Sequence, residues 1–119
     1  MLRKVLIQLC EQHGLPFHRT GTVVTIEGPR FSTRAESRMF RAWGADIINM
    51  SIATEAALAN EAGIPYAAIA MSTDYDCWKT DEEPVSWQAV LAVFHSNAEK
   101  VTRLLVEAIP LIAANKNGP

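Results

Sequence analysis

Two aspartates separated by one residue, Asp74 and Asp76, follow a run of small and apolar residues in the stretch AAIAMSTDYDCW (67–78). The apolar run has the composition of a buried strand, so the two carboxyl groups come directly after a strand end. A carboxyl group that keeps its proton can donate it to a leaving group or hold a ring nitrogen. This pair is therefore the first candidate in the chain for acid–base chemistry.

Two other interpretations of the aspartate pair fit the residues as well. Asp74 can cap the turn after the strand while Asp76 is solvated, which is common in turns. An Asp-x-Asp pair can also bind magnesium through its oxygens, but that needs further oxygen ligands or a bound phosphate group. The sequence offers no obvious additional carboxylate beside the pair. On position alone, the acid and the capping interpretations are equally compatible with the sequence.

Two further stretches place chemically useful residues after a predicted strand. In NMSIATE (49–55), Ser51 stands between a strand and a helix. A hydroxyl and the free N–H groups at a helix start can bind an anion, although a plain N-cap is the more common role. Met50 beside it suits either the core or a soft apolar surface under a sugar.

The remaining strand end, EGPRFST (27–33), carries an aromatic ring after a Gly-Pro turn. Most such rings belong to the core, but Phe31 at a ligand site could stack on a flat base. We expect Arg30 and Arg34 to be solvated or ion-paired. Because parallel strands bring their carboxyl ends to one edge of a sheet, all these stretches should meet there.

Composition bounds the class of protein. The chain has 119 residues, of which 49% are apolar and 20% charged, and a net charge of -2, which is typical of one globular domain. No basic block supports nucleic-acid binding, and no apolar run reaches the ~18 residues of a membrane span. Residues 1–14 lack the unbroken apolar core of a signal peptide and fit an ordinary helix.

The cysteines and histidines do not predict a metal site. Cys10 and Cys77 are not part of a CxxC motif, and His13, His18 and His95 do not stand at metal-ligand spacing from them. We expect both cysteines to be reduced thiols of a cytoplasmic protein, and neither to be a nucleophile.

Apolar periodicity and turn residues predict alternating helices and strands. Thr33 and Glu36 form a capping-box pattern at the start of one helix, whose apolar face carries Ala35, Met39, Phe40 and Trp43. Gly44 and Gly63 should end two helices, and Pro110 should bend or end the last one. The predicted helices cover 2–13, 32–44, 53–63 and 86–114, and the predicted strands cover 17–28, 45–51 and 65–74.

Strands that are apolar on both faces and alternate with helices predict an α/β fold, with a mostly parallel sheet flanked by helices. Three strands are few for such a sheet, whose outer edges must be covered. The predicted fold is therefore incomplete, and a partner chain or the rest of a domain should complete it.

The same stretches resemble one family. TIEGPRFS, RAES, WGAD and TDYDCW stand in the order and spacing of the methylthioadenosine phosphorylases, in the trimeric branch of the purine nucleoside phosphorylases. The resemblance covers about 2–112 and implies that residues 1–119 are the C-terminal portion of a single nucleoside phosphorylase domain, without its N-terminal half. It implies phosphorolysis of methylthioadenosine to adenine and methylthioribose 1-phosphate, with phosphate as co-substrate and no metal or organic cofactor.

The resemblance also assigns roles to matching positions. Asp74 and Asp76 would read the six-amino group and N7 of adenine, with Asp74 as the catalytic acid. The sugar and phosphate contacts would come from Met50 and Ser51. The other implied substrate-binding residues are Phe31 against the base or sugar, Ser32 where six-oxo-purine enzymes carry Glu, Thr73, and Trp87 in the methylthio pocket, where a smaller aliphatic residue is usual.

Two departures from the family pattern concern phosphate. Thr54 replaces a Pro just before Glu55, which could shift the helix start. The Gly-rich phosphate loop and the Arg-His pair of the family's N-terminal half are absent from this sequence. We therefore expect the chain alone to be a poor catalyst, since phosphate needs positioning and a cationic partner. A homotrimer is implied for the complete protein, and no nucleic-acid or membrane partner.

Two alternatives from different classes stay open. The chain could belong to a phosphorylase for another purine nucleoside. It could instead be a truncated, non-catalytic relative that keeps a purine pocket or a subunit interface.

Overall fold

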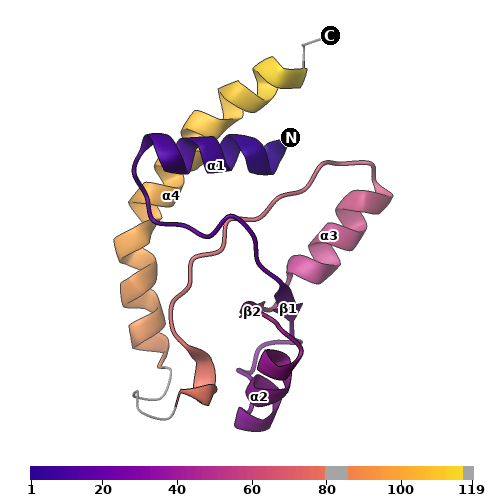
Figure 1. The fold of residues 1–119 in the computed structure, drawn as a ribbon, viewed down its shortest axis with the longest axis vertical. Helices are drawn as coiled ribbons and strands as arrows, with labels where there is room; N and C mark the ends of the chain where they lie inside the picture. The colour runs from indigo at the N-terminus through magenta and orange to yellow at the C-terminus, as the bar shows by residue number, and fades with distance from the viewer. Residues whose placement is uncertain (80–85, 117–119) are drawn as a thin grey trace.

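The structure is a computed structural model that describes residues 1–79 and 86–116, and Figure 1 shows its fold. In these residues the elements are α1 (Leu2–Gln12), β1 (Val23–Thr25), α2 (Arg34–Ala42), β2 (Ile47–Asn49), α3 (Ile52–Glu61), the 3-10 helix η1 (Asp76–Trp78) and α4 (Trp87–Lys116). Helices alternate with parallel strands, so the predicted α/β class is confirmed.

The sheet is small and parallel. Val24 lies opposite Ile48, and the ladder continues through a 2.8 Å hydrogen bond from the Ile26 N–H to the Asn49 carbonyl. The first strand, Val23–Thr25, is much shorter than the predicted strand over 17–28. The carboxyl ends of β1 and β2 lie side by side, as the candidate site requires.

The predicted third strand over 65–74 is wrong. Residues 64–75 run without regular secondary structure from the end of α3 to η1, passing between α4 and the sheet (Figure 1). A strand is held by hydrogen bonds to a neighbouring strand, and among the described residues β1 and β2 pair only with each other. The apolar run thus has strand composition without a strand partner.

Local signals at the helix ends are confirmed. The Thr33 hydroxyl accepts from the Glu36 N–H at 3.2 Å, and the Glu36 carboxylate accepts from the Thr33 N–H at 2.7 Å. Gly44 and Gly63 follow α2 and α3 with φ of 80° and 66°, a left-handed conformation that favours glycine. Pro110 does not end α4, which continues to Lys116.

The main hydrophobic core joins α1 to α4. Val5 and Leu9 pack against Leu104 and Ala108, where α1 crosses α4 in Figure 1. A hydrogen bond of 2.7 Å between His13 Nε2 and the carboxylate of Glu107 closes the same contact. This small core holds the two helices together at a distance from the strand ends.

Many predicted core residues are exposed instead. Phe40 of α2 is buried, but Trp43 on the same predicted face is 69% exposed, and Met39 and Ala35 are exposed as well. Burial needs a second surface, and the described part of the chain provides none for these side chains. Among the described helices, none is both long and apolar enough to cross a membrane.

Candidate functional site

A pocket of about 140 Å³ lies at the carboxyl ends of the two strands. Its walls come from the segment after β1, the segment after β2, the turn before η1 and the first turn of α4. The residues predicted from sequence that line it are Phe31, Ser32, Met50, Thr73, Asp74 and Asp76. The structure therefore brings together residues that are up to 45 positions apart. Phe31 and Met50 follow two parallel strands that end at one edge, whereas the turn of Asp74 and Asp76 reaches this edge without a strand before it.

The two aspartates are held differently. Asp74 accepts a 2.8 Å hydrogen bond from the Asp76 N–H and a 2.7 Å hydrogen bond from the Thr73 hydroxyl. The prediction that Asp74 caps this turn is thus confirmed. It does so while lining the pocket, so capping and a role in binding do not exclude each other.

The capping interpretation also expected Asp76 to be solvated, and the structure contradicts that part of it. Its carboxylate is partly buried, and the Ser32 hydroxyl donates to its two oxygens at 2.8 and 2.9 Å. Its backbone has φ of 59°, a conformation uncommon for a residue other than glycine. Ser32 therefore fixes the direction of this carboxylate, which faces the pocket as a hydrogen-bond acceptor.

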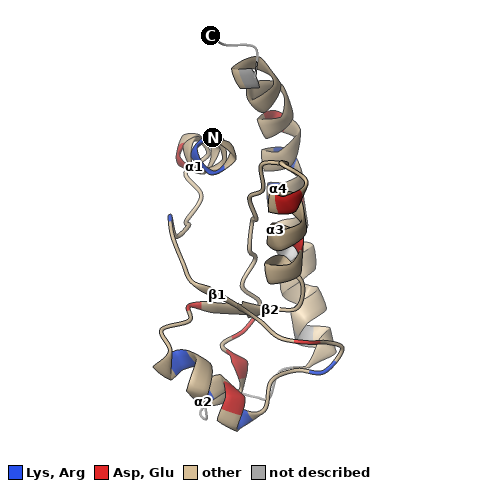
Figure 2. Ribbon diagram, turned by 90° about the vertical axis from the view of Figure 1, so that its right-hand side faces the viewer, with Lys and Arg blue, Asp and Glu red and all other residues tan. Residues whose placement is uncertain are grey.

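The acidic turn is also anchored from α2. The Arg41 guanidinium lies 3.7 Å from the centre of the Trp78 ring, a cation–π contact between α2 and η1. Figure 2 shows this acidic turn beneath β2 and close to α2. The turn thus stays attached to the rest of the pocket although 64–75 forms no strand.

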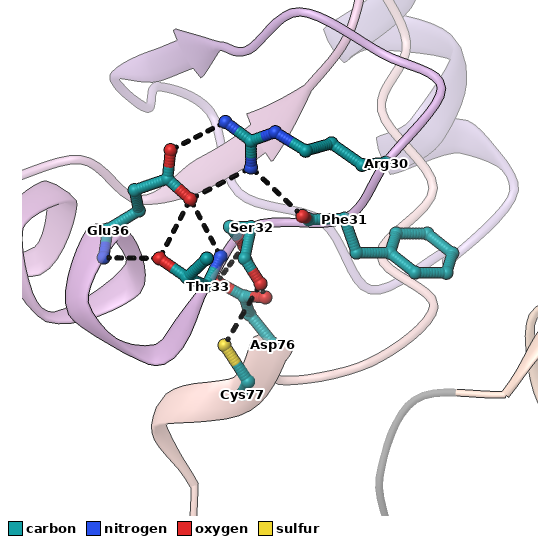
Figure 3. A network of polar contacts seen from close by, with 7 residues as sticks. All are labelled: Arg30, Phe31, Ser32, Thr33, Glu36, Asp76 and Cys77. Carbon is teal, nitrogen blue, oxygen red and sulfur yellow. Dashed lines mark hydrogen bonds and ion pairs between the residues drawn. The ribbon is translucent and has the colours of Figure 1, made fainter.

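A polar network fixes the loop that carries Phe31 and Ser32 (Figure 3). Arg30 binds both carboxylate oxygens of Glu36, at 2.9 and 2.7 Å, and donates to the Phe31 carbonyl at 3.1 Å. The Arg30 guanidinium, helped by the N–H and hydroxyl of Thr33, lowers the pKa of Glu36 to about 2. The expectation of an ion-paired Arg30 is confirmed, and the ion pair closes the loop onto α2.

The pKa of Glu36 makes this loop sensitive to acid. Its folded-state value, about 2 against an ordinary 4.5, means that the ion pair stabilises the fold above about pH 4.5 and is lost as the pH falls toward 2. The variant Glu36→Gln keeps a capping acceptor but removes the charge. We expect it to lower the urea midpoint at pH 7, and the deficit to shrink at pH 2.

The control for that comparison is Glu61→Gln, at the exposed end of α3. It removes the same charge, and among residues 1–79 and 86–116 no arginine or lysine forms an ion pair with Glu61 as Arg30 does with Glu36. A deficit of equal size at pH 7 and pH 2 for Glu36→Gln would contradict the assignment, as would an equal deficit for both variants.

Met50 enters the pocket because residue 28 has no side chain. A Cβ on Gly28 would lie 2.8 Å from the Met50 sulfur, too close for a real contact. Met50 is itself half-exposed at the pocket, so it is not a core residue. A thioether at this place offers a soft apolar surface for a ligand.

Ser51 is the residue before α3, but its hydroxyl does not cap the helix. The first free N–H groups of α3 bind other side chains: the Ile52 N–H donates to the Asn49 side chain at 3.3 Å, and the Ala53 N–H to the Thr25 hydroxyl at 3.1 Å. Ser51 instead hydrogen-bonds Glu55, and this bond is the main cause of a lowered Glu55 pKa. Ser51 is therefore the N-cap residue of α3 by position, as predicted, but its hydroxyl makes no capping hydrogen bond. Phosphate binding by Ser51 stays a prediction.

The structure adds pocket residues and leaves two predicted residues, Ser51 and Trp87, outside the pocket lining. Asn49 lines the pocket and could have been found as the last residue of its strand. Trp87 is 62% exposed and is not among the lining residues, whereas Val90, three residues further along α4, is. Trp87 and Val90 are neighbours on the surface of α4, and only Val90, almost one turn further along, reaches this pocket.

Metal ligation has little geometric support in the described part of the chain. In residues 1–79 and 86–116, no three His, Cys, Asp or Glu side chains gather closely enough to hold an ion. Cys77 donates from its sulfur to the Ser32 carbonyl at 3.4 Å, and so helps to hold the loop. Burial is the main cause of the raised pKa of Cys10, far from the pocket.

Fold and pocket together define an α/β protein with a small pocket, lined by two aspartates, at the carboxyl ends of parallel strands. The sequence profile of the phosphorylase superfamily matches residues 1–110. The chain therefore belongs to the phosphorylase superfamily.

Its relatives include methylthioadenosine phosphorylases. The S-methyl-5'-thioadenosine phosphorylases of Xenopus tropicalis and Anopheles gambiae are each 57% identical over 112 residues, which cover 94% of this chain and 40% of each relative. The methylthioadenosine phosphorylase of Schistosoma mansoni, solved with adenine, superposes with a TM-score of 0.85 at 40% identity, over 95% of this chain and 45% of that one. A mutant of the Schistosoma enzyme was solved with methylthioadenosine. The chain thus spans about 40% of the length of the curated relatives it matches.

Proposed function

We propose that this chain supplies the adenine- and ribose-binding part of a pentosyltransferase that cleaves methylthioadenosine with phosphate. The products are adenine and methylthioribose 1-phosphate. The observation that carries the proposal is the 140 Å³ pocket, where two oriented carboxylates meet an aromatic ring and a thioether. Relatives named for this reaction and solved with adenine or methylthioadenosine support it.

The geometry suits a reaction at a purine leaving group. A phosphate oxygen attacks the anomeric carbon, the carbon–nitrogen bond breaks, and its electron pair passes to the purine. A proton from Asp74 to N7 neutralises that charge as it develops. Asp76, held by Ser32, accepts from the six-amino group, whereas the oxygen of a six-oxo purine would meet it as acceptor against acceptor.

The neighbouring residues take the remaining roles. Thr73 orients Asp74 through its hydroxyl, and Phe31 packs against the base. Met50 lies under the ribose. Phosphate binds at Ser51, and Trp87 borders the methylthio group, roles that rest on the family resemblance.

The complete protein would be a cytoplasmic homotrimer of purine and methionine salvage that uses no metal or organic cofactor. The chain alone would turn over poorly. Its sequence has neither the Gly-rich loop nor the Arg-His pair of the family, and without them phosphate is neither positioned nor charge-paired.

Calorimetric titration of the chain with methylthioadenosine and with inosine tests the proposal. We expect methylthioadenosine to bind at least about 10-fold more tightly, since one unmatched hydrogen bond to a charged group costs about 1.5–3 kcal/mol. Equal binding would favour a phosphorylase for another purine nucleoside. Tight binding with no turnover, even after the rest of a phosphorylase chain is added, would favour a non-catalytic purine-binding protein.

A further inference from the structure

The turn that carries the two aspartates has an uncommon backbone conformation. Asp76 lies in the left-handed region, with φ of 59°, which residues other than glycine rarely adopt. Such a conformation is costly and persists only where surrounding contacts hold it. The hydrogen bond from the Asp76 N–H to the Asp74 carboxylate lies within the turn, so it shapes the turn but does not attach it to the pocket. The place of both carboxylates therefore depends on contacts from outside the turn.

Contacts from outside reach the turn from two sides. On one side, the Ser32 hydroxyl donates to both oxygens of the Asp76 carboxylate, and the Cys77 sulfur donates to the Ser32 carbonyl (Figure 3). On the other side, the Arg41 guanidinium of α2 lies 3.7 Å from the centre of the Trp78 ring. Arg41 is itself exposed, so this cation–π contact is of moderate strength and can be removed without opening the core. The turn is thus held between the loop after β1 and the helix α2.

An aromatic pair connects Trp78 to the aspartates. Tyr75 stands between Asp74 and Asp76 in the chain. Its ring meets the Trp78 ring edge to face, with centroids 6.0 Å apart and an interplanar angle of 84°. The Lys79 ammonium lies 4.0 Å from the centre of the Tyr75 ring and holds that ring from within the same turn. A shift of Trp78 would therefore move Tyr75, and with it the backbone that carries both carboxyl groups.

The helix α2 is a firm support for this contact. Its first turn is fixed by the capping box and by the ion pair of Glu36 with Arg30. Phe40, next to Arg41 in the chain, is 9% exposed and anchors the other end of the helix. One helix thus holds two walls of the pocket, because its first turn holds the loop of Phe31 and its last turn holds the turn of the aspartates.

We infer that Arg41 is a positioning residue of this site. By stacking on Trp78, its guanidinium holds the turn in the conformation that presents Asp74 and Asp76 to the pocket. The 3-10 helix η1 begins at Asp76, so the contact controls this carboxylate most directly. The hold on the turn is independent of the proposed function, whereas its consequence for nucleoside binding rests on that function. The consequence is a higher affinity for methylthioadenosine, because a larger fraction of the chain has the binding-competent turn.

Hydrogen exchange at the Asp76 amide, followed by NMR without ligand, tests the hold on the turn. The variant Arg41→Met keeps an unbranched apolar stem and removes the guanidinium. We expect it to speed exchange of this amide about 3- to 10-fold, the effect of one cation–π contact, and Trp78→Leu to do at least as much. The matched control is Arg38→Met, which removes the same charge from an exposed position of the same helix and should change nothing.

Calorimetric titration with methylthioadenosine tests the consequence for binding. We expect Arg41→Met to weaken binding about 3- to 10-fold, Arg41→Lys to weaken it less because the charge stays, and Arg38→Met to leave it unchanged. The variant Asp76→Asn completes a double-mutant cycle with Arg41→Met. Because Arg41 acts through Asp76, the double variant should lose less affinity than the product of the two single fold-losses. A purely structural role of Arg41 would instead multiply the two losses.

Unchanged exchange at the Asp76 amide in Arg41→Met overturns the inference, as does an equal change in Arg38→Met. Full multiplication of the two losses in the cycle overturns it as well. If exchange speeds up as expected but the chain binds no methylthioadenosine, the positioning role stands and only the proposed function is refuted. Should the urea midpoint show that Arg41→Met does not fold, Arg41→Lys decides the same comparison, because lysine keeps the charge but lacks the planar stacking face.

Discussion

Replacing Asp74 with asparagine is expected to weaken methylthioadenosine binding by about 10- to 150-fold, since a hydrogen bond to a charged group contributes about 1.5–3 kcal/mol. Asparagine has no acidic proton to give to N7, and its amide N–H₂ group can donate to the oxygen of a six-oxo purine. Inosine binding should therefore improve relative to methylthioadenosine. In a complete, active enzyme that contains this chain, Asp74→Asn should lower kcat by about 10²–10⁴-fold, because the catalytic acid is lost.

Asparagine suits this test because it keeps the turn. Its carbonyl oxygen can still accept from the Asp76 N–H, which Asp74 holds at 2.8 Å. The matched control is Asp46→Asn at the other end of β2, where the carboxylate accepts from the Thr22 N–H at 2.6 Å. Calorimetry on both variants with both nucleosides gives the comparison. If Asp46→Asn weakens methylthioadenosine as much as Asp74→Asn, net charge rather than base reading is responsible.

The largest expected effect on stability comes from the α1–α4 core. Leu104 is 3% exposed against Val5 and Leu9, so Leu104→Ala should cost about 2–5 kcal/mol and detach α1 from α4. Its neighbour Leu105 is 48% exposed, and Leu105→Ala should cost far less. Urea unfolding followed by circular dichroism measures both variants.

The paired design separates burial from helix propensity, because both variants make the same change at adjacent positions of α4. Similar losses for the two variants would show that this contact does not hold the helices together. A loss confined to Leu104→Ala would show that the buried core contributes to the attachment of α1. The core is so small that one cavity would remove much of its apolar contact.

Local signals in the sequence determined most of the helices. The Thr33–Glu36 capping box and the left-handed Gly44 and Gly63 involve atoms only a few residues apart, so no distant partner was needed to predict them. The meeting of Phe31 and Met50 was also predictable, because both follow parallel strands that end at one edge. Asp74 and Asp76 lie where they were predicted to lie, but contacts of their turn with Ser32 and Arg41, rather than a strand, hold them there.

Only the tertiary structure decided what depends on a second surface. The apolar run at 65–74 has the composition of a strand but forms none, because hydrogen bonds to a neighbouring strand make a strand and none is present in the described residues. Trp43 has the pattern of a core residue yet is exposed, and Ser37 is polar yet buried. The sequence by itself determined which segments can be helical or extended and which residues carry chemistry. Their pairing, burial and orientation depend on contacts between distant segments, which local patterns do not encode.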